Sequence, residues 1–166
     1  MYKEIKNGNS SGRVRIQNDK VFWDSNDKNI LQIAISEIVV IGEYTNSDGP
    51  FFDDWFLAFV TRDEHLQSIP MYAENIDELT QYLSKKFNCD LNSTHFANST
   101  EWKSIIRYPT NLKDKPLFTL ELPNNYKSPK TYLSKILSSV VLGNINNVQN
   151  IVLTEDVKNE LANACR

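Results

Sequence analysis

With 166 residues, of which 40% are hydrophobic and 11% aromatic, the chain is long enough for one ordinary domain and apolar enough to form a core, which excludes global disorder. Its net charge is −3, and its two cysteines lack CxxC spacing, which excludes a disulfide framework or cysteine zinc site and suits a reducing compartment. The amino terminus lacks the apolar region of a signal peptide. The longest apolar run, residues 55–60, is far shorter than the roughly 20 residues that cross a bilayer. We therefore expect a soluble, cytoplasmic protein.

The first half of the chain is dominated by strand signals. Val14 and Ile16 alternate with polar residues, and Trp55, Leu57 and Phe59 alternate with a second apolar set that occupies the opposite face. Asn- and Asp-rich segments separate these runs, as is typical of hairpin turns. The expected strands are residues 13–17, 21–23, 31–35, 38–42, 55–60 and 66–72.

An amphipathic helix is predicted next, at residues 75–87. Asn75 is the expected N-cap, and Glu78 three residues later completes the pattern of a capping box. Apolar residues recur at helical spacing and predict one stripe that another element must cover. The stripe consists of Ile76, Leu79, Leu83 and Phe87.

The order of several meandering strands followed by one amphipathic helix resembles pleckstrin-homology-like domains. The likeness covers residues 12–88, with ISEIVVIGEY, WFLAFV and SIPMY in the places of strands. It implies a bent, barrel-like antiparallel sheet whose open end is plugged by the helix. The loops of this chain run acidic, so the basic phosphoinositide-binding loop of that family is not carried over, and membrane binding is not expected.

A C-terminal part, residues 101–166, is predicted to mix strands and helices, either as a separate core or sharing one core with the first half. The fold class is therefore α+β. Its basic residues are expected on a solvated face. This applies to six that lie in turns and at strand ends, for which a contact with an anionic partner, or with the acidic stretch of residues 41–90 in an oligomer, is the alternative: Lys103, Arg107, Lys113, Lys115, Lys127 and Lys130. The expected elements are strands at 102–108, 117–122 and 151–153 and helices at 128–142 and 154–163.

Negative charge is concentrated in one stretch. Residues 41–90 hold 10 acidic and 3 basic side chains, net −7, whereas residues 1–40 carry +1 and residues 91–166 carry +3. Such a stretch repels phosphate backbones, so nucleic acid is not an expected partner. A basic protein is attracted to it, mainly through faster association.

Two aspartates interrupt the apolar run GPFFDDWFLAFV, residues 49–60. They either mark a solvated strand mouth that discourages pairing with other chains, or belong to a surface on which rings supply buried area and carboxylates steer a basic partner. A calcium loop is disfavoured because the phenylalanines interrupt the required spacing of oxygen ligands. The candidate partner-binding residues are Glu43, Asp48, Phe51, Phe52, Asp53, Asp54, Asp63 and Glu64.

Catalytic and nucleotide-binding signatures are missing from the sequence. The chain has no GxSxG, HExxH, GxGxxG or GxxxxGK[ST] pattern. Its only histidines, His65 and His95, lie thirty residues apart, and sequence neighbours seldom face each other across a catalytic site. We therefore expect a non-enzyme that needs no cofactor or metal.

Small size, acidity and the lack of a catalytic set are similar to features of bacterial immunity proteins, which block toxins by masking their active sites. We therefore expect a non-catalytic, cytosolic protein that binds a basic protein partner. One alternative is a structural or scaffold module of a larger bacterial complex, for which a homodimer is an option. A third is an enzyme whose site gathers one of the two histidines with acids from the other half of the chain.

Overall fold

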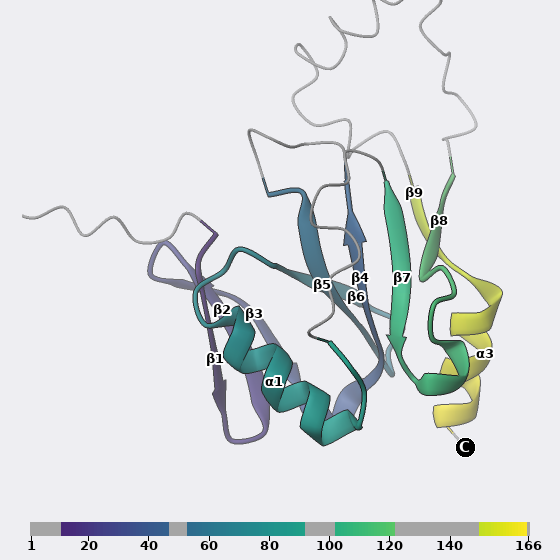
Figure 1. Cartoon of the computed structure of the whole chain (residues 1–166), viewed down its shortest axis with the longest axis horizontal. Coiled ribbons are helices and arrows are strands. Elements are labelled where there is room, and N and C mark those ends of the chain that lie inside the picture. Colours follow the sequence, from purple (N-terminus) through teal and green to yellow (C-terminus); the bar gives the residue numbers. More distant parts are fainter. Residues whose placement is uncertain (1–10, 47–52, 92–101, 122–149, 166) are drawn as a thin grey trace, which may run out of the picture. The chain divides into compact units, whose positions relative to one another are not determined.

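The computed structural model describes residues 11–46, 53–91, 102–121 and 150–165 (Figure 1). The chain divides into two compact units, residues 1–117 with 155–166 and residues 118–154. The predicted helix at 128–142 lies outside the described residues, and so do three of the candidate site residues. These are Asp48, Phe51 and Phe52.

The larger unit begins with a meander of three antiparallel strands. Two-residue turns connect them, and Asn18, Asp19, Asn26 and Asp27 all adopt a positive φ between 50° and 60°. Asn and Asp tolerate this left-handed conformation, which type I′ hairpin turns require. The predicted hairpins are thus confirmed. The strands are β1 (Arg13–Gln17), β2 (Lys20–Ser25) and β3 (Lys28–Ala34).

A four-stranded antiparallel sheet follows, after a short 3-10 helix η1 (Ile35–Glu37). Its strand order is β6-β5-β4-β7, so β7 from the C-terminal part pairs with β4 from the first half. The predicted end of β4 at Gly42 is wrong, because pairing with β5 continues to Thr45 opposite Trp55. The strands are β4 (Ile38–Thr45), β5 (Trp55–Thr61), β6 (Leu66–Pro70) and β7 (Lys103–Tyr108).

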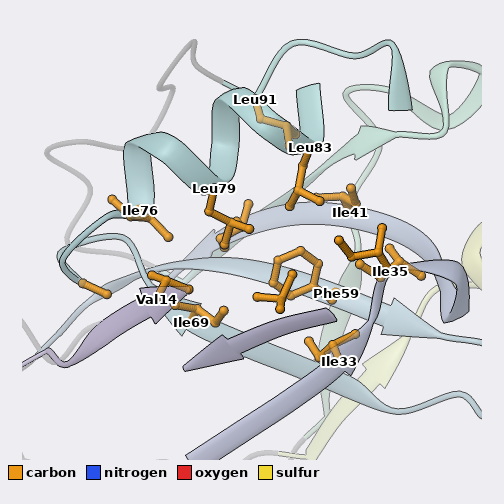
Figure 2. Packing of buried hydrophobic residues seen from close by; sticks show 14 residues of the cluster. Val14, Ile33, Ile35, Ile41, Phe59, Ile69, Ile76, Leu79, Leu83 and Leu91 are labelled. Carbon is orange, nitrogen blue, oxygen red and sulfur yellow. The ribbon is translucent and has the colours of Figure 1, made fainter. Parts of the chain in front are cut away.

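The main hydrophobic core draws buried side chains from β1 to β6 and from helix α1 (Ile76–Phe87). Figure 2 shows Leu79 and Leu83 pointing from α1 toward Phe59 of β5. Ile76, Leu79 and Leu83 are buried and Phe87 is partly buried against the same core, which confirms the predicted apolar stripe. Burying each such side chain stabilises the fold by about 1.5–3 kcal/mol, so α1 is fixed to the sheet mainly by this stripe.

The predicted capping box at the start of α1 is wrong. Asn75 adopts the left-handed conformation at φ 67°, and its side chain makes no cap hydrogen bond. Instead, its Nδ2 donates to the carbonyl of Val14 at 3.2 Å, while the Val14 amide donates to the carbonyl of Glu74. The residues before α1 therefore run beside the edge of β1, and this pairing takes up the side chain that would otherwise cap the helix.

Helix α3 (Glu155–Ala164) belongs to the same unit, contacts β4 and confirms the helix predicted at 154–163. It buries Val157 and Leu161. An ion pair from Lys115 to Asp156 at 2.9 Å and a hydrogen bond from Arg62 to the carbonyl of Ala164 hold its two ends. The 3-10 helix η2 (Thr110–Leu112) also contributes, since Asn111 donates to Glu160 at 3.3 Å.

In the described part of the smaller unit, β8 (Phe118–Glu121) and β9 (Asn150–Leu153) form an antiparallel pair in which Thr119 lies opposite Val152. The predicted strands near 117–122 and 151–153 are thus confirmed. The fold is α+β, with antiparallel sheets and the amphipathic helix α1 after strands β1 to β6, as the sequence predicts. Among the described residues, no helix is long and apolar enough to span a bilayer.

Candidate partner-binding site

Asp53 and Asp54 directly precede β5 and lie beside the C-terminal end of β4. We call this N-terminal end of β5, with Asp53, Asp54 and Trp55, the mouth of β5. The Asn46 amide donates to the carbonyl of Asp54 at 2.9 Å and continues the pairing of the two strands by one residue. The Ser11 hydroxyl donates to Asp53 Oδ1, and the Tyr72 hydroxyl to Asp54 Oδ1, both at 2.7 Å. Both donors are neutral, so these hydrogen bonds orient the carboxylates and leave their negative charge in place.

Tyr72 gives this mouth an exposed aromatic ring. The residue is 45% exposed, and its ring meets that of Trp55 edge-on, with centroids 6.2 Å apart and planes at 80°. Partial burial, the hydrogen bond to Asp54 and the charges of Asp54 and Asp53 raise the pKa of Tyr72 to about 12. Burial is the largest of these causes, and the two carboxylates add to it because a nearby negative charge disfavours the ionised phenolate.

Tyr72 is a site residue that sequence analysis missed, although strand pairing could have indicated it. Phe56 lies opposite Pro70 in the β5–β6 pair, and the Met71 amide donates to the carbonyl of Trp55. Continuing this antiparallel register by one step places residue 72 beside residue 54. The register of the β5–β6 pair therefore brings the Tyr72 ring next to the Asp54 carboxylate.

The prediction that Glu43 belongs to the acidic binding surface is wrong, because the residue is only 4% exposed. It shares the core-facing side of β4 with Ile41, two residues earlier. Its Oε1 lies 3.3 Å from Nε of Arg107 on β7, and its Oε2 accepts a hydrogen bond from Nε1 of Trp55 at 3.0 Å. The carboxylate is thus an internal brace for Trp55 and not part of a docking surface.

The prediction that Arg107 lies on a solvated basic face is also wrong, since the residue is only 3% exposed. The sequence places it in a strand next to buried Ile106 but offers no local sign that its charge is matched from β4, sixty-four residues earlier. Buried charges are tolerated when they are paired. The Glu43–Arg107 pair therefore accounts for two charged residues that sequence analysis assigned to the surface.

The remaining candidate acids, Asp63 and Glu64, lie at the opposite end of β5. The seven residues of β5 separate the two ends by about 20 Å, so the acidic stretch does not form one surface. Asp63 accepts from the Thr61 hydroxyl, which lowers the pKa of its carboxyl, and its Oδ2 lies 2.7 Å from Nδ1 of His65. Nearby, Nε of Arg62 lies 3.8 Å from Oε2 of Glu37.

An open, polar depression of about 240 Å³ adjoins this far end of β5. Thr61 and Asp63 contribute to its lining from one side, and Gln32 and Glu37 from the other. Two basic side chains of the same chain lie beside its acids, Arg62 next to Glu37 and His65 next to Asp63. Within the part of the chain that the structure describes, no group of three or more His, Cys, Asp or Glu side chains could hold a metal ion. His95, the other histidine, lies outside the described residues.

No protein-family model, curated protein or solved structure matches this chain. The likenesses to pleckstrin-homology-like domains and to immunity proteins therefore stay predictions from the sequence.

Proposed function

We propose that this protein is a non-catalytic binding protein that docks a basic protein partner at the mouth of β5. The observation that carries the proposal is the arrangement of Asp53 and Asp54, which are held by neutral hydroxyls beside the exposed ring of Tyr72. The carboxylates attract and orient a cationic surface, and the ring supplies area that can be buried. Both contributions are needed, because charge alone gives fast but weak association.

The specific form of this proposal is an immunity-type protein that acts in the cytoplasm and neutralises a basic toxin. The net charge of −3 on the chain and the two carboxylates at the mouth support it, since an acidic protein associates faster with a basic target. Glu43 and Arg107 support it indirectly, because their buried pair fixes Trp55 beneath the mouth. A preset binding surface loses less conformational entropy on docking.

Two matched double variants test the proposal. The partner is isolated from the native host with the full chain as bait, purified, and titrated against each variant by calorimetry. Asp53→Asn with Asp54→Asn removes two charges at the mouth and keeps an oxygen acceptor for each hydroxyl. Asp63→Asn with Glu64→Gln removes the same charge at the far end of β5.

We expect the mouth variant to weaken binding by about tenfold or more and the far-end variant to change it by less than about threefold. Equal losses from both variants would show that only net charge matters. A loss confined to the far-end variant would place the docking surface at the other end of β5. Either result overturns the proposal.

A further inference from the structure

An exposed arginine of this protein already shows how the chain binds a guanidinium. Cζ of Arg15 lies 4.0 Å from the ring centroid of Phe22, its neighbour across the β1–β2 pair. Its Nε donates to Oδ2 of Asp24 at 2.8 Å, and this bond lowers the pKa of the Asp24 carboxyl. The guanidinium thus stacks on one aromatic face while it bonds to a neighbouring carboxylate, two interactions that a planar, delocalised cation combines.

The mouth of β5 presents the same two chemical groups. Tyr72 offers an aromatic ring with 45% of the residue exposed, and Asp54 lies directly beside it, joined by the 2.7 Å hydrogen bond. A carboxylate has about four acceptor positions, so the bond from Tyr72 leaves capacity for a guanidinium. Asp53 on the adjacent position adds a second negative charge.

The ring is also held in place. Trp55 meets Tyr72 edge-on at 6.2 Å, and the Trp55 indole is itself fixed by its hydrogen bond to buried Glu43 at 3.0 Å. An aromatic face that is already oriented costs less entropy to use than a mobile one. The pKa of Tyr72, raised to about 12 by burial and by Asp54 and Asp53, agrees with a negative potential that favours a cation there.

We infer that Tyr72, Asp54 and Trp55 form a recognition site for an arginine side chain of the partner protein. The guanidinium stacks on the Tyr72 ring and donates to Asp54, as Arg15 does with Phe22 and Asp24 within the chain. Arginine is favoured over lysine because its planar fork makes stacking and directed hydrogen bonds together, whereas an ammonium is a compact, strongly hydrated charge. This inference rests on the proposed function and names the partner group that it requires.

The test uses capped amino acids with the full chain and does not require the partner. Nα-acetyl-arginine N-methylamide is titrated while the indole N–H signals are followed by NMR, and the signal of Trp55 is assigned by its loss in Trp55→Phe. The citrulline analogue has the same shape without the charge, and the lysine analogue has the charge without the fork. The indole signals of Trp23 and Trp102 report whether each variant is folded.

We expect the arginine probe to shift the Trp55 signal saturably, the citrulline probe to leave it unchanged, and the lysine probe to bind at least threefold more weakly. Asp54→Asn weakens arginine binding about tenfold and Tyr72→Leu about threefold, while Asp63→Asn has no effect. Equal responses to arginine and citrulline, or tighter binding of lysine, overturn the inference.

The inference and the proposed function can fail separately. If the arginine probe does not bind but the basic partner still depends on Asp53 and Asp54, the arginine site is wrong and the docking surface stands. If the probe binds at Tyr72 and the partner ignores Asp53→Asn with Asp54→Asn, the proposed function is wrong and the arginine site stands.

Discussion

The two ends of β5 carry similar acidic pairs and use them differently. At the mouth, Asp53 and Asp54 accept hydrogen bonds from the neutral hydroxyls of Ser11 and Tyr72. At the far end, the Asp63 carboxylate is shared between Thr61 and His65, both of which belong to the same tight turn. The first arrangement keeps the charge available for another molecule, and the second uses it within the turn.

This difference between the two ends of β5 shows that counting charges along a sequence is not enough to locate a binding surface. Glu43 and Asp54 lie eleven residues apart in the same acidic stretch, yet one is 4% exposed and paired with Arg107, and the other lies at the surface beside an exposed ring. What decides the role of each carboxylate is the donor it meets and the depth at which it lies.

The largest effect that separates the two ends is expected from Glu43→Ala. This change leaves the buried guanidinium of Arg107 without its carboxylate, so we expect the free energy of unfolding to fall by about 3–5 kcal/mol. Glu64→Ala, at the exposed far end, should change it by less than about 0.5 kcal/mol. Urea unfolding of both variants measures the difference. Equal, small effects would show that Glu43 does not brace the mouth.

A smaller effect concerns the pH dependence at the mouth. The pKa of Tyr72 rises from 10 in the unfolded chain to about 12 in the fold, so the neutral phenol is the form that the fold favours. This stabilisation is fully present below pH 10 and is lost as the pH rises through 12. We expect it to contribute about 1 kcal/mol, after allowance for solvent exposure of the ring.

NMR titration of ¹³C-labelled tyrosine measures this pKa directly. Asp54→Asn should lower it toward 10, though not completely, because partial burial of the ring contributes most to the shift. Asp63→Asn should leave it unchanged. A Tyr72 pKa near 10 in the unmodified protein would show that the negative potential at the mouth is absent.

The smallest effect is expected at the far end. The hydroxyl of Thr61 is the main cause of the lowered pKa of Asp63, so Thr61→Val should raise that pKa toward its usual value of 3.8. The stabilisation from this carboxylate is present above that value and is lost as the pH falls through the lower folded pKa. Carboxyl NMR titration measures the shift. An unchanged pKa would mean that His65, and not Thr61, controls Asp63.

Much of the fold could be predicted because it depends on short-range patterns. The alternation of Trp55, Leu57 and Phe59 identifies β5, and the Asn-Asp pairs identify two hairpin turns. The apolar stripe of α1 is equally local. Asn75 shows the limit of such reasoning, since its side chain bonds to Val14, sixty-one residues earlier, and the capping box that its sequence suggests does not form.

The candidate site could be predicted only in part. Asp53 and Asp54 follow from their position before a strand, but the sequence pattern ends the strand at Gly42 and so leaves Glu43 outside it, whereas β4 continues to Thr45. Its partner Arg107 comes from a strand that sequence reasoning could not align with β4. Tyr72 is identified only by the pairing of β6 with β5, which places it beside Asp54. The error at Glu43 concerns the length of β4, whereas those at Arg107 and Tyr72 concern contacts between strands.

The most direct test of the account is the salt dependence of association with the purified basic partner. The association rate constant is measured by stopped flow between about 0.05 and 0.5 M salt, for the natural chain and for the mouth and far-end double variants. The account predicts a steep fall with salt for the natural chain and the far-end variant, and a much shallower fall for the mouth variant. Equal slopes for all three proteins would contradict the claim that the mouth of β5 is the docking surface.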